Sequence, residues 1–376
     1  MREAGGGRPA TEGAGPPNQT RAGLSHIRNS GTRAQPTQRP ATCPPAPLFW
    51  GLPPEGWGPS IVPTCCLTTL QRVANTTHSA VPDERNAGVL VYINGEFVTR
   101  DQARISVFDS GFLVGDGIWE GIRLHRGRFA FLDRHLDRLF HGLETAAIDP
   151  GMTRPEVEAL LRAVVDRNGM TDGVHVRLMI TRGDKKTPSQ HPANLVGGPN
   201  VVVVAEWKQA DPGVRDRGIR LATSSVRRPP PDTLDQRLNT HSKIHEVIAL
   251  VEAVRAGADE ALMLDSEGNV ATCNATNFFM VADGEVWTSV GHSNLPGITR
   301  AVVLEEARAA GIPANERPFG VSDVYAADEA FVTGTFGGLT PVVEVDGRPI
   351  SHGLSGPMTA RLRDLYEARV ERETTT

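Results

Sequence analysis

The chain alternates between segments in which every second residue is apolar and segments in which apolar residues recur every three or four positions. The first spacing is typical of strands and the second of helices. Alternating or β-branched runs predict strands, several of them joined as hairpins by turns such as Asn94-Gly95. These runs are residues 89–100, 104–111, 122–131, 174–183, 200–208, 218–226, 260–265, 277–289, 329–335 and 341–350.

Five segments have the helical spacing. The clearest start is Thr153, which forms a capping box with Glu156, and the clearest ends are Gly169 and Gly257. Because helices and hairpin-connected strands are mixed along the chain, we expect an α+β fold with two domains. The predicted helices are residues 132–148, 153–169, 243–257, 299–311 and 357–372.

Residues 1–86 have neither spacing and are rich in Pro, Gly and Arg, which predicts a disordered extension. The first 82 residues alone hold 13 of the 28 prolines in the 376-residue chain. We expect a small α+β domain over residues 87–208 and a larger second domain over residues 209–372. About 290 residues are enough to bury a hydrophobic core.

Charge and composition exclude several classes of partner. The net charge is −5, and residues 1–80 carry +4, which leaves −9 on the remainder. An acidic body argues against a nucleic-acid partner. No apolar run approaches the roughly 18 residues of a membrane span, and the first residues lack a signal-peptide core. Cys273 is the one cysteine after residue 66, so we expect a protein of the reducing cytoplasm without an internal disulfide.

Several isolated features could carry chemistry, but each has a simpler interpretation. His241 and His245 lie one helical turn apart, yet no third metal ligand is visible, so we predict a solvated helix start and no metal site. An isolated buried cysteine such as Cys273 is more often inert packing than a nucleophile.

The glycine-rich run at residues 115–121 opens no helix, so it matches a dinucleotide-binding loop poorly. Three acidic residues lie in or beside this run, and we interpret them as turn and cap residues around glycines. They are Asp109, Asp116 and Glu120.

Two loops favour a bound phosphate. Residues 296–300 enter a helix, so free backbone N–H groups and the Thr299 hydroxyl form an anion site there. Residues 333–338 follow a strand and offer small residues and hydroxyls where the backbone can approach a phosphate. Either loop alone is equally consistent with a helix cap or a tight turn, but two of them favour a phosphate ligand.

Four motifs resemble the class IV (fold type IV) pyridoxal-phosphate (PLP) aminotransferases, a group that includes branched-chain and D-amino-acid aminotransferases and aminodeoxychorismate lyase. The motifs occupy residues 115–139, 259–281, 295–300 and 327–350. The resemblance spans about residues 90–368. It implies a small N-terminal α/β domain, a larger β-rich PLP-binding domain with flanking helices, and a homodimer.

The resemblance also implies roles for individual residues. Arg138 matches the arginine that pairs with the cofactor phosphate, to which a guanidinium can donate two hydrogen bonds. The rest of the phosphate cradle corresponds to Ile298, Thr299 and Thr335. The segment on the substrate side corresponds to Phe112, Val114 and Trp119, and Arg177 lies on a strand near that pocket.

The catalytic lysine departs from the family pattern. In the family, a lysine about 13 residues before the position of Glu252 forms a Schiff base with the cofactor and shuttles a proton. Here that position is Asn239. Lys243, nine residues before Glu252, is the best candidate for the role, and the alternative is a surface lysine at a helix start.

A second departure concerns the pyridine nitrogen of the cofactor. Family members have a glutamate that keeps this nitrogen protonated, and here the position is Thr272. A hydroxyl can hydrogen-bond to the nitrogen but supplies no negative charge.

We therefore expect an aminotransferase that moves an amino group between a branched-chain-like amino acid and a 2-oxo acid, with PLP as cofactor. Two alternatives stay open because of Asn239 and Thr272. One is a PLP-dependent lyase of the aminodeoxychorismate-lyase type, and the other is a catalytically silent member that binds a phosphorylated ligand.

Overall fold

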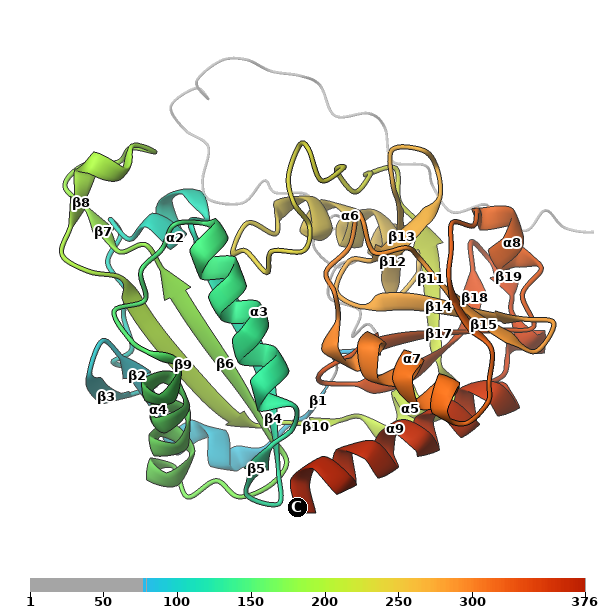
Figure 1. Cartoon of the computed structure of the whole chain (residues 1–376), viewed down its shortest axis with the longest axis horizontal. Helices are drawn as coiled ribbons and strands as arrows, with labels where there is room; N and C mark the ends of the chain where they lie inside the picture. Colours follow the sequence, from blue (N-terminus) through green and yellow to red (C-terminus); the bar gives the residue numbers. More distant parts are fainter. Residues whose placement is uncertain (1–76, 79, 376) are drawn as a thin grey trace, which may run out of the picture. The chain divides into compact units, whose positions relative to one another are not determined.

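Two sheets dominate the computed structural model, which describes residues 77, 78 and 80–375 (Figure 1). The first sheet has six strands in the order β3-β2-β9-β6-β4-β5, and all neighbouring strands are antiparallel. Its strands are β2 (Leu90–Ile93), β3 (Glu96–Thr99), β4 (Gly117–His125), β5 (Arg128–Phe129), β6 (Val174–Thr181) and β9 (Asn200–Trp207).

Strand β4 has two chemically different faces because its side chains alternate. Ile118 and Ile122 are buried against helix α3 (Leu132–Thr145), which packs on this sheet together with α4 (Arg154–Arg167). Trp119 and Arg123 are on the opposite face. The helices therefore cover one face of the sheet and leave the other available to line a site.

The second sheet has nine strands in the order β13-β12-β11-β18-β17-β14-β15-β16, with β19 paired to β18. Only β11–β12, β11–β18 and β15–β16 are parallel. Its strands are β11 (Ile219–Thr223), β12 (Glu260–Leu264), β13 (Val270–Cys273), β14 (Asn277–Ala282), β15 (Glu285–Thr288), β16 (Ala314–Glu316), β17 (Glu329–Gly334), β18 (Gly338–Val345) and β19 (Arg348–Pro349).

Helices α6, α7 and α9 pack on this sheet through small or branched apolar residues. Ala249 and Ala253 of α6 contact Ala261 of β12, and Val302 of α7 shares a core with Leu362 of α9. None of the described helices has the length and apolar character of a membrane span. The helices of this half are α5 (Pro212–Arg217), α6 (Ile244–Arg255), α7 (Ile298–Ala309), α8 (Val321–Tyr325) and α9 (Pro357–Thr375).

The predicted α+β class is confirmed, but one predicted strand is wrong. Residues 104–111 form turns and the start of a short helix, α2 (Ser110–Val114), which is capped by Asp109. Val107 and Phe108 remain exposed, and the segment meets β7 (Asp184–Lys185) only through an isolated bridge from Asp109 to Asp184 and a bond from the Lys185 N–H to the Phe108 carbonyl. Alternation alone therefore misled the prediction. Helices α5 and α8, of six and five residues, were too short for the periodicity to reveal.

Part of the predicted extension 1–86 is structured. Residues 1–76 and 79 lie outside the described residues. Strand β1 (Ala80–Val81) pairs with β10 (Gln209–Ala210), and Thr77 donates from its backbone N–H and its hydroxyl to buried Glu260. The predicted domain boundaries stay predictions. The remaining short elements are η1 (Glu84–Gly88), β7 (Asp184–Lys185), η2 (Pro192–Asn194), β8 (Leu195–Val196) and η3 (Ser351–Gly353).

The hydroxyl contact of Thr77 predicts a measurable stability effect. Thr77→Val removes one donor to a carboxylate that is 1% exposed, so we expect the free energy of unfolding to fall by about 1–3 kcal/mol. Denaturant unfolding of the full chain measures this. Thr99→Val is the matched control, since its hydroxyl donates to Asp101 on the surface. Equal stability of both variants would show that the contact contributes nothing.

Candidate active site

A cavity of about 400 Å³ gathers most of the sequence-predicted site residues. Its walls come from the open face of the first sheet, the start of α6, the turn after β13, the start of α7 and the β17–β18 turn. The predicted residues among its lining are Trp119, Arg138, Arg177, Lys243, Thr272, Ile298, Thr299 and Thr335.

One end of the cavity offers several hydrogen-bond donors to an anion. Helix α7 begins after Gly297, so the free N–H groups of its first turn and the buried Thr299 hydroxyl lie at the wall. A Cβ atom on Gly297 would lie 2.0 Å from Asn277 Oδ1, which explains the glycine. Thr333 adds a buried hydroxyl without a hydrogen-bond partner.

Arg138 reaches this end from α3 in a fixed orientation. Its Nε and Nη2 donate to the two carboxylate oxygens of Glu120 at 2.7 and 2.8 Å, and Nη1 donates to the carbonyl of Pro296 at 2.8 Å. His135 Nδ1 lies 2.7 Å from the same carboxylate. Nη1 and Nη2 each retain one N–H for a ligand. The side chain thus ties α3 to the loop before α7.

Glu120 is not a turn residue, so its sequence interpretation was wrong. It lies on β4 between Ile118 and Ile122, on the face covered by α3, and it is fully buried. Burial alone would raise the pKa of its carboxyl, but Arg138 and His135 hold this pKa below its ordinary value. The sequence held a signal for this: Glu120 is two residues from both Ile118 and Ile122, so on a strand it shares their buried face. Asp109 is a cap as predicted, because it caps α2. Asp116 follows Gly115, and both of its carboxylate oxygens accept from Arg182 at 2.7 and 3.0 Å, so it is an ion-pair partner and not a cap.

Asn239 and Lys243 both line the cavity, on a segment that runs beside β4. The backbone N–H of Trp119 donates to the Asn239 carbonyl at 3.0 Å, and the side-chain amide of Asn239 donates to the Trp119 carbonyl at 2.7 Å. Asn239 Oδ1 is buried without a partner. Lys243 is the N-cap residue of α6, and its side chain is 32% exposed. The chain therefore brings Lys243 to the cavity four residues after Asn239.

Thr272 lies on β13, and its hydroxyl proton takes part in a hydrogen bond within the protein. Its Oγ1 donates to the carbonyl of Thr276 at 2.7 Å, so toward a ligand it offers only an acceptor lone pair. Neighbouring Cys273 also lines the cavity. Burial raises the pKa of its thiol well above the ordinary value, which keeps it protonated and inert, as the sequence suggested.

The predicted substrate residues divide into two groups. Arg177 lies opposite Gly121 on neighbouring strands, and its guanidinium stacks on Trp119 at 4.0 Å from the ring centroid. Both line the cavity. Phe112 and Val114 of α2 do not line it in this chain, and Phe112 is 68% exposed. The role of these two residues stays a prediction.

Sequence reasoning missed several residues of the cavity wall. His78 was assigned to the disordered extension, but its ring is stacked on Phe336, with centroids 6.5 Å apart. Lys208 lies over the same ring at 4.5 Å, and His175 Nδ1 is buried without a partner. Burial lowers the pKa of both histidines. The strand period of β6, on which His175 is two residues before Arg177, could have revealed His175.

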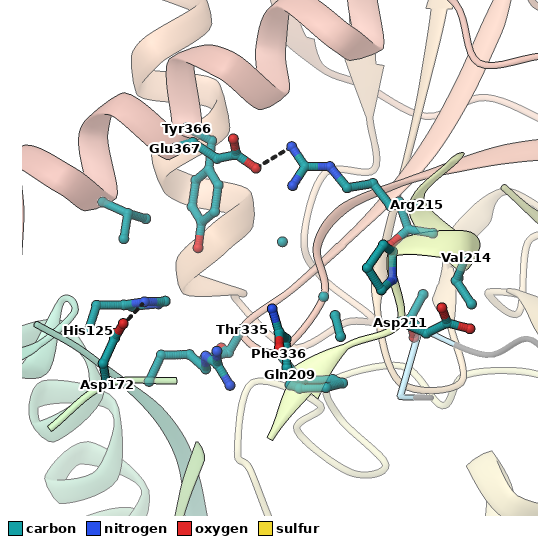
Figure 2. Close-up of a pocket in the computed structure, with 18 of the residues that line it drawn as sticks. His125, Asp172, Gln209, Asp211, Val214, Arg215, Thr335, Phe336, Tyr366 and Glu367 are labelled. Carbon is teal, nitrogen blue, oxygen red and sulfur yellow. Dashed lines mark ion pairs between the residues drawn. The ribbon is translucent and has the colours of Figure 1, made fainter. Parts of the chain in front are cut away.

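A second cavity, of about 490 Å³, shares the residues around Phe336 with the first (Figure 2). Its charges are largely paired with one another. Figure 2 shows Arg215 directed at Glu367. This ion pair measures 2.5 Å, and Arg126 and Glu371 of the same lining pair at 2.5 Å. Because the first cavity holds the free donors and the predicted residues, we assign the candidate active site to it.

The sequence matches the model of the family described as amino-transferase class IV over residues 117–345. It is 40% identical over 291 residues to branched-chain-amino-acid aminotransferase-like protein 2 of Arabidopsis thaliana, covering 77% of this chain and 51% of that protein. The chain thus spans about half the length of that relative. It is 33% identical over 286 residues to the branched-chain-amino-acid aminotransferase of Pseudomonas aeruginosa, covering 74% and 91%.

A solved structure has the same fold. The T.th. branched-chain amino acid aminotransferase complexed with N-(5'-phosphopyridoxyl)-L-glutamate superposes with a TM-score of 0.70 and 34% identity, covering 76% of this chain and 95% of that one. The fold predicted from the sequence motifs is confirmed.

The buried group around Glu120 predicts a pH dependence. Its folded pKa lies below the ordinary value of 4.5, so its stabilising effect is present above that pH and is lost as the pH falls through the folded pKa. Glu120→Gln should lower the free energy of unfolding at pH 7 by about 3 kcal/mol, because it leaves Arg138 without its charge partner. It should also weaken the loss of stability in acid.

Denaturant unfolding between pH 7 and acid measures both effects. Glu158→Gln, an exposed change on α4, is the control and should behave as the wild type. A Glu120→Gln variant as stable as the wild type at pH 7 would contradict this account of the Arg138 orientation.

Proposed function

Because this chain belongs to the class IV aminotransferase family, we propose that it is a PLP-dependent aminotransferase acting on a branched-chain-like amino acid and a 2-oxo acid. The observation that carries the proposal is that one cavity joins an anion-binding end to a partly buried lysine. Arg138, Thr299 and Lys243 come from three separate parts of the chain and line it together. Members of the family use PLP.

The residues present fit this cofactor. A phosphate at the start of α7 would receive the two free N–H groups of Arg138, the first backbone N–H groups at Ile298 and the hydroxyls of Thr299 and Thr335. The buried Thr333 hydroxyl, which has no hydrogen-bond partner, is a further donor in the lining of this cavity. Thr272 would contact the ring nitrogen as an acceptor, which suits a protonated nitrogen.

When bound, PLP supplies an aldehyde carbon and an electron-withdrawing ring. Lys243 would hold the cofactor through its side-chain amine, and Nζ, when free, would take up and return the proton of the substrate Cα. Burial lowers the pKa of Lys243, which increases the neutral fraction that these roles need.

The walls beside Lys243 suit a substrate with an apolar side chain. Trp119, Val247 and Leu250 line the cavity there. The relative from Pseudomonas aeruginosa and the solved T.th. structure are both named branched-chain aminotransferases, which supports the same substrate class. Arg177, which stacks on the Trp119 ring in the same cavity, is our candidate to receive the substrate carboxylate.

Removal of the amine tests the proposal. Lys243→Ala should lower the rate of amino transfer from a branched-chain amino acid to a 2-oxo acid at least about a hundredfold, since the proton carrier is lost. Steady-state assays with added PLP measure this. Lys186→Ala, an exposed lysine outside the cavity, should keep the wild-type rate. Wild-type rates in both variants would refute the role of Lys243.

We also propose a homodimer, as the family resemblance implies. Ile244 and Ile248 on α6 are 68% and 47% exposed, and α2 exposes Phe112. The two segments adjoin, because Ser242 Oγ donates to the Gly115 carbonyl at 3.2 Å. Large apolar side chains exposed on adjoining segments favour an interaction site there.

A charge on this surface should prevent dimer formation. Ile248→Asp would bury an unpaired carboxylate at the interface, so light scattering after gel filtration should report a monomer. Leu354→Asp, at a position 68% exposed elsewhere on the chain, is the control and should remain dimeric. If the wild type is itself monomeric, the proposed dimer is wrong.

A further inference from the structure

We propose that Glu246 is the positioning residue of Lys243: its carboxylate, fixed by Arg228, holds the lysine amine at the cavity wall and sets the pH at which that amine becomes nucleophilic. The inference deepens the proposed function, because it concerns the lysine to which that function assigns the amine chemistry. It rests on three observations: a contact, an anchor and the charge composition of the cavity.

The contact is between neighbours on one helix face. Lys243 and Glu246 are three residues apart at the start of α6, where side chains at this spacing are adjacent. Lys243 Nζ lies 3.6 Å from Glu246 Oε1. The Glu246 side chain is 8% exposed, so water screens this pair far less than a surface ion pair.

The anchor is a buried arginine that keeps Glu246 in place. Arg228 Nη1 donates to Glu246 Oε1 at 2.8 Å, and its Nε donates to the Ser293 carbonyl at 3.0 Å. His245 Nδ1 lies 3.0 Å from the second carboxylate oxygen. Burial alone would raise the pKa of Glu246, but His245, Lys243 and Arg228 lower it to about 2. Glu246 is therefore an anion at every working pH.

The charge composition of the cavity gives the Glu246 carboxylate a large effect on Lys243. Glu246 is the only acidic residue among the described residues that line the cavity. Cationic side chains are numerous there: Arg138, Arg177, Lys208, Arg228 and Lys243. A single carboxylate among several desolvated cations has a large effect on whichever amine it contacts.

The groups that face Lys243 come from three elements. Glu246 on α6 favours the charged amine, whereas Arg228 before α6 and Arg138 on α3 disfavour it, as does burial. His241, two residues earlier, also interacts with Lys243 electrostatically. Burial is the largest of these effects and lowers the pKa of Lys243. Removal of Glu246 and removal of Arg228 should therefore shift this pKa in opposite directions.

The pH dependence of amine acetylation tests this without the cofactor. The full chain is exposed briefly to trace acetic anhydride, which reacts only with neutral amines, and the acetylated fraction of Lys243 is read from its peptide by mass spectrometry. Glu246→Gln should move the midpoint for Lys243 down by about one pH unit, and Arg228→Gln should move it up by a similar amount. A purely structural role cannot produce opposite shifts.

Two further variants distinguish the effect of the Glu246 charge from an effect of misfolding. Glu246→Asp keeps the charge on a shorter arm, so its midpoint should lie between those of the wild type and Glu246→Gln. Glu252→Gln changes a carboxylate on the same helix that is bonded to Ser224 and Ser225, and it should leave the midpoint unchanged. Near-ultraviolet circular dichroism checks that each variant is folded.

An unchanged midpoint in both Glu246→Gln and Arg228→Gln would overturn the inference, as would shifts in the same direction. If only Arg228→Gln is folded, its upward shift supports the inference and its absence contradicts it. This result is independent of the amino-transfer assay. Opposite shifts in a chain that transfers no amino group would leave the positioning role intact and refute the proposed function.

Discussion

The ion pair between Glu120 and Arg138 is the interaction on which the geometry of the site depends. Arg138 uses three of its five N–H groups on Glu120 and on the carbonyl of Pro296, so one side chain connects the first sheet to the loop that starts α7. Its two remaining N–H groups are left for a ligand. A buried pair of this kind contributes little net stability but fixes orientation, since breaking it strands a charge in the core.

A second constraint follows from the face that β4 turns to the cavity. Trp119 and Gly121 of β4 line the cavity on this face. Two hydrogen bonds between Trp119 and Asn239 attach the Asn239 segment to the strand. Asn239 carries no amine, and in the proposed function Lys243 supplies one from the start of α6. A cation is ordinarily unfavourable next to a helix N-terminus. Glu246 offsets this cost.

The sequence predicted the elements that depend on local pattern. Spacing, capping and glycine chemistry predict the helix that carries Arg138, the anion site at Thr299 and the turn at Thr335. All three residues line the cavity. The family motifs located the fold. Residues 104–111 were misassigned because alternation cannot report whether a neighbouring strand forms a continuous ladder; here β7 makes only an isolated bridge, at Asp109.

The contacts that the sequence did not predict are those between distant segments. Glu120 and Arg138 are 18 residues apart, and Arg228 and Glu246 are also 18 apart, with an irregular segment between them that has no readable period. Thr77 and Glu260 are 183 residues apart. Such pairs depend on how sheets and loops pack, which a local pattern does not encode.

We propose that Lys243, and not another lysine, carries the amine chemistry of this cavity. Reduction with borohydride in the presence of PLP, followed by peptide mapping, tests it most directly, because it converts a bond between an amine and the cofactor aldehyde into a stable label. We predict one labelled peptide containing Lys243 and no label in Lys243→Ala. A label on Lys208 or on a surface lysine, or none on the wild type, would contradict it.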